Sequence, residues 1–256
     1  RCQALGGAKN HAIVMPDADM DNAVNQLVGA AFGSSGERCM ALSVAVAVGD
    51  EAGDALVSKM TAAMQNLKVG AYTDNSNDFG PVITREHQEK VNGFISSGEA
   101  QGAEVVVDGR NPQVDGYENG FFVGATLIDR VTPEMDSYKA EIFGPVLHII
   151  EYEANQLESI CDEINGSGYG LTFGIHSRIN HRIETISKRI LVGNIYINRN
   201  MVGAVVGSQP FGGCGLSGTG PKAGGQHYLQ RFATEQTVSI NTTAIGGNAS
   251  LLTLDE

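Results

Sequence analysis

The sequence has few cysteines and shows no metal-binding pattern. Its four cysteines in 256 residues are Cys2, Cys39, Cys161 and Cys214, with neither CxxC pairs nor the spacing of a metal site. The six histidines are scattered, without acidic residues at ligand spacing. A chain of this length does not depend on a disulfide framework. We therefore expect a reducing, cytoplasmic setting and no bound metal.

Basic clusters and long apolar segments are also missing. The 17 Lys and Arg against 29 Asp and Glu give a net charge of −12 and a pI near 4.9. Nucleic acids and anionic membranes are bound through clustered Lys and Arg, so we expect neither as a partner. Apolar runs are short, as in 42–48, and a membrane-spanning helix needs about 20 residues. No signal peptide is recognisable, and a first residue that is Arg1 rather than Met favours a fragment.

Helical and strand patterns alternate along the chain. Apolar residues recur at helical spacing in several segments. The expected helices cover 17–33, 56–67, 84–97, 154–165 and 179–190. The expected strands cover 42–48, 104–108, 121–128, 145–152, 171–177 and 192–198. This alternation predicts an α/β fold with a mainly parallel sheet flanked by helices.

The end of the chain differs from this pattern. Residues 234–243, TEQTVSINTT, are typical of a strand, and no helix follows them. We therefore divide the chain into a main domain at 1–232 and a C-terminal strand and tail at 233–256. A terminal strand without a local partner often pairs with another subunit, so we expect a homo-oligomer.

One cysteine lies in a setting that suits a nucleophile. Cys39 follows glycines in GSSGERCM (33–40), between an expected helix and an expected strand, and Arg38 places a positive charge beside it. A catalytic thiol needs partial exposure and surroundings that favour the thiolate. A lone cysteine is more often a small buried residue. The motif alone leaves both interpretations open.

A glutamate precedes a second turn. In KAEIFGPVLHI (139–149), Glu141 stands before an Ile-Phe-Gly-Pro turn that leads into an expected strand. Ligand groups in α/β folds gather at strand ends, so Glu141 is a candidate to hydrogen-bond a sugar hydroxyl. A solvated glutamate before a structural turn fits the pattern equally well.

The segment SQPFGGCGLSGTGPKAGG (208–225) is rich in glycine. Three of its glycines form a G-x-G-x-x-G, but the dinucleotide fingerprint needs a strand before it and a helix starting within it. Pro210 before these glycines and Pro221 after them disfavour such a strand and such a helix. The Lys-Ser/Thr ending of a P-loop is also absent. A loop offering backbone N–H groups to a carboxylate is the better interpretation. Loops as long as 197–227 usually serve function.

Four motifs together resemble the aldehyde dehydrogenase superfamily. LGGAKNH (5–11), GERC (36–39), EIFGPV (141–146) and PFGG (210–213) occur in that family's order. Residues 1 to about 145 resemble methylmalonate-semialdehyde dehydrogenase, notably in VMPDADMD, GERCMA and DGRNPQVDGYENGFF. The remainder resembles the pyrroline-5-carboxylate (glutamate semialdehyde) dehydrogenase module of bifunctional proline-utilisation enzymes, in NRNMVGAVVGSQPFGG, GLSGTGPKAGGQHYL and RFATEQTVSINTTA. The resemblance assigns 1–232 to a catalytic domain.

The resemblance implies an NAD-dependent reaction through a thioester on Cys39. The backbone N–H of Cys39 would help to stabilise the oxyanion. Glu141 would hold the nicotinamide ribose, Phe143 would pack near the ring, and Leu5 would also contact the cofactor. The residues expected to bind the aldehyde or its carboxylate are Phe211, Arg38, Gly215, Ser217 and Gly218.

Two departures from the family bear on this chemistry. Most hydrolytic members have a glutamate directly before Leu-Gly-Gly, and Ala4 at this position cannot accept a proton. The methylmalonate-semialdehyde enzymes release the acyl group to coenzyme A, whereas the enzymes that the back half resembles hydrolyse it. The family's cofactor-binding region, with its GxTxxG loop and oxyanion-hole asparagine, lies before the part matched by Arg1, so we expect a separate N-terminal half.

The leading prediction is the catalytic half of a CoA-acylating methylmalonate or malonate semialdehyde dehydrogenase. Glutamate semialdehyde is the alternative substrate. A truncated, non-catalytic module that serves oligomerisation is a second alternative. Thioester transfer to CoA without redox chemistry is a third.

Overall fold

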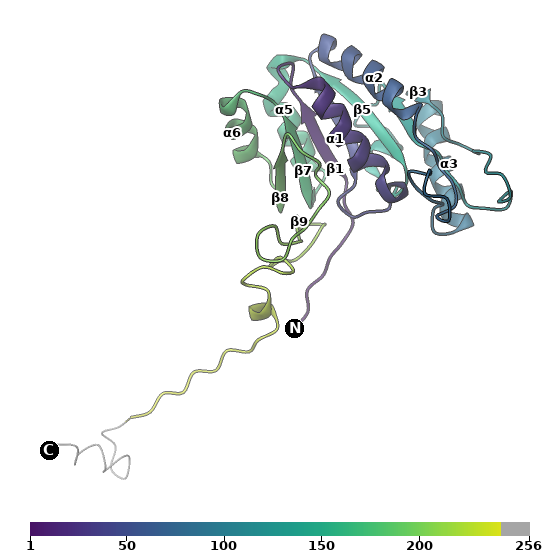
Figure 1. Ribbon diagram of the computed structural model, residues 1–256. Helices are drawn as coiled ribbons and strands as arrows, with labels where there is room; N and C mark the ends of the chain where they lie inside the picture. The colour runs from purple at the N-terminus through teal and green to yellow at the C-terminus, as the bar shows by residue number, and fades with distance from the viewer. Residues whose placement is uncertain (242–256) are drawn as a thin grey trace.

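A seven-stranded sheet lies between two layers of helices in the computed structural model, which describes residues 1–241 (Figure 1). The strand order is β3-β4-β5-β2-β1-β7-β8, and all neighbours are parallel except the β3–β4 pair. The strands are β1 (Asn10–Val14), β2 (Leu42–Val48), β3 (Glu104–Val107), β4 (Thr126–Asp129), β5 (Val146–Tyr152), β7 (Thr172–His176) and β8 (Asn194–Ile197). The α/β class and the mainly parallel sheet are confirmed.

The helices cover both faces of this sheet. They are α1 (Met20–Phe32), α2 (Asp50–Met64), α3 (Arg85–Ala100), α4 (Asp136–Lys139), α5 (Leu157–Gly166) and α6 (Asn180–Arg189). The short turns η1 (Gly33–Gly36), η2 (Ala154–Gln156) and η3 (Leu229–Arg231) are 3-10 helices. Caps fix two helix starts, because Asp19 accepts from the N–H of Asn22 and Thr84 accepts from the N–H of His87.

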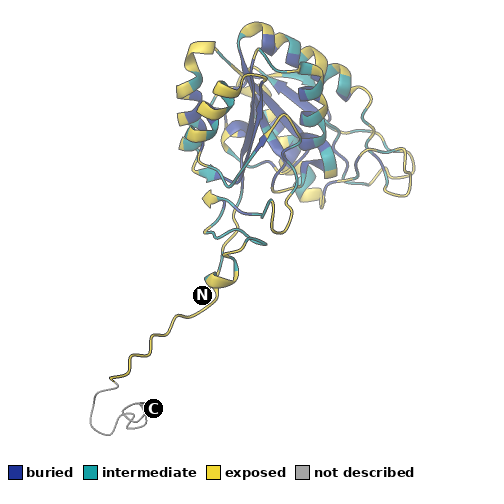
Figure 2. Ribbon diagram, turned by 60° about the vertical axis from the view of Figure 1, so that its left-hand side comes forward, coloured by how far each residue is buried: buried dark blue, intermediate teal, exposed yellow. Residues whose placement is uncertain are grey.

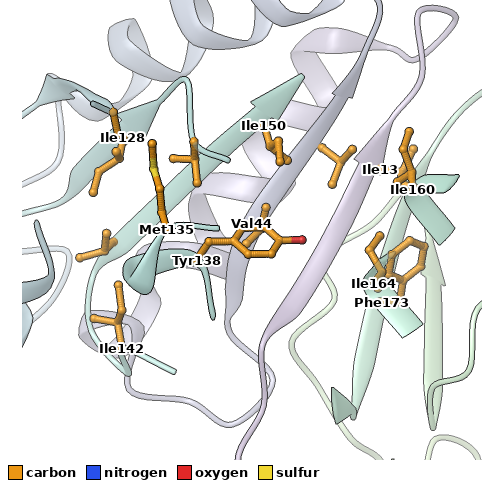
Figure 3. Close-up of a cluster of buried hydrophobic side chains, with 14 of the residues drawn as sticks. Ile13, Val44, Ile128, Met135, Tyr138, Ile142, Ile150, Ile160, Ile164 and Phe173 are labelled. Atoms are coloured by element: carbon orange, nitrogen blue, oxygen red, sulfur yellow. The ribbon is translucent and has the colours of Figure 1, made fainter. Parts of the chain in front are cut away.

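The alternation of side chains along the strands produces two cores. On β2, Val44 and Val46 face the core beneath α3, α5 and α6, whereas Ala45 and Ala47 face α1 and α2. The valine side continues into an isoleucine-rich cluster around Tyr138 (Figure 3). The buried strands are enclosed by helices whose outer faces are exposed (Figure 2). Small side chains on the alanine face let α1 and α2 lie close to the sheet.

Two strand predictions differ from the structure. The central strand β1 was not predicted, because NHAIV is only five residues long and carries two polar side chains, yet all five residues are buried. The strand predicted at 121–128 is shorter and covers Thr126–Asp129. Residues 121–125 are irregular because Gly124 donates to the carbonyl of Gly109 at 2.7 Å instead of joining the sheet.

The C-terminal segment carries no strand within its described part. Residues 233–241 run as exposed chain away from the sheet (Figure 2). The last two residues of the strand predicted at 234–243 lie outside the described residues. The pairing of this segment with another subunit therefore stays a prediction.

Within residues 1–241, no helix is long and apolar enough to cross a membrane. The same part of the chain shows no group of three or more His, Cys, Asp or Glu side chains placed to hold a metal ion.

Candidate active site

Cys39 lies at the amino edge of the sheet, three residues before β2, and it is exposed. The loop before it contains three consecutive residues with positive φ, Ser34 (53°), Ser35 (57°) and Gly36 (67°). A Cβ on Gly36 would overlap the carbonyl oxygen of Gly144. The glycine therefore allows the nucleophile loop, residues 33–39, to lie directly against the turn that follows Glu141.

A buried asparagine holds the backbone of Cys39. Asn10, 3% exposed, donates from Nδ2 to the carbonyls of Cys39 (2.9 Å) and Ala41 (2.8 Å). Its Oδ1 accepts from the N–H of Thr172 at 3.3 Å. Asn10 thus ties Cys39 to β1 and to β7. The sequence contained one signal for this role, a polar side chain at the start of an apolar run, because buried amides need partners.

Glu141 lies against the LGGAKNH segment. Its Oε1 accepts from the N–H of Ala8 at 2.9 Å. A Cβ on Gly7 would lie 2.7 Å from Oε2, so this glycine leaves room for the carboxylate. Glu141, Phe143, Arg38 and Cys39 line one hollow. The structure therefore brings together four predicted residues from two motifs that lie about 100 positions apart in the sequence.

Lys9 is a buried amine that lines this hollow and was not predicted. It is 5% exposed, and its Nζ donates to the carbonyls of Ser137 and Ala140, both at 2.8 Å. Burial lowers the pKa of Lys9 to about 7, against the opposing effect of the negative charge on Glu141. Lys9 thereby fixes the chain immediately before Glu141.

Two exposed side chains complete the hollow. Arg38 donates from Nε to Ser34 Oγ at 3.1 Å, and its guanidinium lies over Gly33. This contact folds the Arg38 side chain back along its own loop, where Arg38 and Cys39 both line the hollow. Phe143 is 38% exposed and has a φ of 59°, so its ring is presented at the surface of the turn.

The glycine-rich loop packs elsewhere. Within residues 1–241, the lining of the hollow includes none of the other predicted contacts, namely Leu5, Phe211, Gly215, Ser217 and Gly218. Leu5 forms a bridge with Gly218. Ser217 is 1% exposed, and its hydroxyl donates to the carbonyl of Gly7 (2.8 Å) and accepts from the N–H of Gly170 (3.1 Å). These contacts stabilise the segment that carries Glu141's partner, Ala8.

The remaining two residues of this group also have structural contacts. Gly215 has a φ of 60° and belongs to β9 (Cys214–Gly215), which pairs with β6 (Tyr169–Gly170). Phe211 forms a bridge with Ala223 and packs against the alanine-side core. Their roles in binding the aldehyde stay predictions.

The mainly parallel sheet covered by helices on both faces is an α/β fold, and an exposed cysteine, an arginine and a glutamate line one hollow at the amino ends of its strands. The aldehyde dehydrogenase family model matches residues 1–238. The chain belongs to the aldehyde dehydrogenase family.

Curated relatives represent both subfamilies that the motifs indicated. The malonate-semialdehyde dehydrogenase of Pseudomonas aeruginosa is 54% identical over 198 residues, which are 77% of this chain and 39% of that protein. The bifunctional protein PutA of Klebsiella aerogenes is 42% identical over 232 residues, which are 90% of this chain and 18% of PutA. The chain therefore spans well under half the length of these relatives.

Solved structures give the same result. Methylmalonate-semialdehyde dehydrogenase from Oceanimonas doudoroffii superposes with a TM-score of 0.82 at 63% identity, covering 86% of this chain and 45% of that one. A 1-pyrroline-5-carboxylate dehydrogenase from Thermus with bound NAD superposes with a TM-score of 0.81 at 33% identity, covering 88% and 42%.

Proposed function

We propose that this chain is the catalytic half of an NAD-dependent semialdehyde dehydrogenase that acts through Cys39. The observation that carries the proposal is the exposed Cys39 in one hollow with Arg38 and Glu141. The cofactor-binding half would come from a separate N-terminal segment, as the partial coverage of the relatives suggests.

The residues of the hollow fit the nicotinamide end of NAD. The Glu141 carboxylate is an acceptor suited to ribose hydroxyls, which donate hydrogen bonds. The exposed ring of Phe143 offers an apolar surface to a flat heterocycle. When bound, NAD supplies the hydride acceptor. The N–H of Ala8 holds the Glu141 carboxylate in place, and the Lys9 amine holds the carbonyl of the preceding residue, Ala140.

Cys39 carries the covalent chemistry. Its thiolate attacks the aldehyde carbon, and after loss of hydride the acyl group remains as a thioester on the sulfur. The backbone N–H of Cys39 stabilises the oxyanion. Asn10 keeps this backbone in place through the carbonyls of Cys39 and Ala41.

A carboxylated aldehyde suits the charges at the site. The guanidinium of Arg38 pairs with the substrate carboxylate. Ala4 leaves no general base where hydrolytic members have one, so the thioester passes to coenzyme A. Glutamate semialdehyde also carries a carboxylate, so the pairing with Arg38 suits both substrates. The absence of a base at Ala4 favours methylmalonate or malonate semialdehyde over glutamate semialdehyde, the alternative suggested by the glycine-rich loop. A non-catalytic oligomerisation module would not need Cys39, Arg38 and Glu141 in one hollow.

We further propose a cytoplasmic, homo-oligomeric enzyme. A reducing compartment keeps the exposed thiol of Cys39 free. The exposed segment 233–241 has alternating apolar side chains, Val238 and Ile240, that suit pairing with another subunit.

The test is thioester trapping with the chain joined to a cofactor-binding half. Mass spectrometry after mixing with NAD and each semialdehyde is expected to find the acyl adduct on Cys39, and added CoA is expected to release it. The Cys2→Ala variant, which removes another exposed thiol outside the glycine-rich loop, serves as the control and should trap equally well. No adduct with any semialdehyde would refute the proposed function, and no response to CoA would refute the acylating route.

A further inference from the structure

His87 lies where three segments of the site meet. It is in the first turn of α3, and its Nε2 lies 2.6 Å from the carbonyl oxygen of Phe143. The same nitrogen lies 3.4 Å from Oε1 of Glu37. A carbonyl oxygen only accepts hydrogen bonds, so Nε2 carries the hydrogen and donates.

The Phe143 turn is in a conformation that needs support. Phe143 has a φ of 59°, a region that bulky residues rarely adopt without strain. The imidazole holds its carbonyl, and the two rings meet edge to face with centroids 6.5 Å apart. In the next turn of α3, Lys90 donates to the carbonyl of Glu141 at 3.4 Å, and Val91 packs against Gly144.

Glu37 connects His87 to the nucleophile loop, of which it is part. It stands two residues before Cys39, and its Oε1 also accepts from the N–H of Ile83 at 3.1 Å. The side chains of His87 and Glu37 are only 14% and 17% exposed, so water competes weakly for these contacts.

We infer that His87 is a positioning residue that fixes the Phe143 turn against the nucleophile loop. The inference rests on the proposed function for its consequence, namely that the ring of Phe143 is oriented toward the cofactor. His87 itself touches neither the reacting atoms nor the sulfur. Its contribution is to hold one carbonyl and one carboxylate at a fixed separation.

Hydrogen exchange tests the inference without requiring catalysis. In His87→Ala, amide exchange in peptides covering 141–146 and 80–84 is expected to rise about fivefold to tenfold, as loss of a hydrogen bond predicts. His87→Gln retains a donor and is expected to restore most of the protection. His181→Ala, at an exposed position on α6, is the matched control and should leave both peptides unchanged.

Two further measurements keep the outcome clear. If His87→Ala does not fold, His87→Phe keeps a ring of similar bulk without the donor, and the same rise in exchange is expected. In the reconstituted dehydrogenase, KM for NAD is expected to rise more than kcat falls. Unchanged exchange in both His87→Ala and His87→Phe would overturn the inference. Failure of the wild-type protein to form NADH would refute the proposed function while the exchange experiment still decides the role of His87.

Discussion

The buried amine of Lys9 makes the stability of this fold depend on pH in an unusual direction. Its pKa falls from 10.5 to about 7 on folding because the side chain leaves water. Between these two values the unfolded chain binds one proton more than the folded chain. Stability therefore rises with pH in this range, and the penalty for burying the charged amine is complete below pH 7.

The size of the effect follows from the two pKa values. A full proton difference changes the free energy of unfolding by about 1.4 kcal/mol per pH unit. The slope is half of this at pH 7, where the folded amine is half protonated, and close to its full value by pH 8. Between pH 7 and pH 9 the contribution of Lys9 is expected to change by about 2 kcal/mol.

The comparison of the wild-type chain with Lys9→Met isolates this term. Methionine leaves the carbonyls of Ser137 and Ala140 without a donor at every pH, so that cost cancels when the two proteins' pH profiles are subtracted. The chain contains no tryptophan, so urea unfolding is followed by circular dichroism at 222 nm. From pH 7 to pH 9, the free energy of unfolding of the wild type is expected to increase by about 2 kcal/mol relative to that of the variant. A constant difference would show that the amine keeps its proton throughout this pH range and would refute the reasoning.

Two other predictions concern the nucleophile loop. Iodoacetamide is expected to alkylate Cys39 before the other thiols and Cys161 last, because burial raises the pKa of Cys161 to about 11; equal labelling, read by peptide mass spectrometry, would contradict this. Gly36→Ala is expected to destabilise the chain by more than about 2 kcal/mol, since the new Cβ meets the backbone of Gly144 at a positive φ. Its control is Gly93→Ala, in α3 with open space around it, which is expected to stabilise by about 0.5–1 kcal/mol; similar melting temperatures for both variants would argue against the close approach.

The sequence predicted elements well where periodicity was strong. β2 was predicted at its observed bounds, and α1 and α3 within three residues, because each has a clear apolar pattern. β1 was missed because a fully buried central strand of five residues has no alternation to detect. The strand predicted at 121–128 failed at its first half because a glycine pair draws the backbone out of the sheet.

From the sequence, only those site residues that lie in family motifs could be predicted. The resemblance pointed to Cys39, Arg38, Glu141 and Phe143, and the fold places them in one hollow. Contacts between segments far apart in sequence left no local signal. Asn10, Lys9 and His87 act on carbonyls 29, 131 and 56 residues away, so their roles needed the tertiary structure. The hydroxyl of Ser217 likewise required the structure before its two backbone partners could be known.

The position of the hollow beside the start of β2 has a practical consequence. Doubly wound proteins usually bind ligands beyond the carboxyl ends of their strands. In this chain, the carboxyl ends of β2 and β5 are followed by short connections to the next helices, at residue 49 and at residues 153–156. β2 has seven residues, so these connections stand roughly 20 Å from the sulfur. A fluorophore or an affinity handle attached there would lie well away from the hollow that holds Cys39 and Glu141.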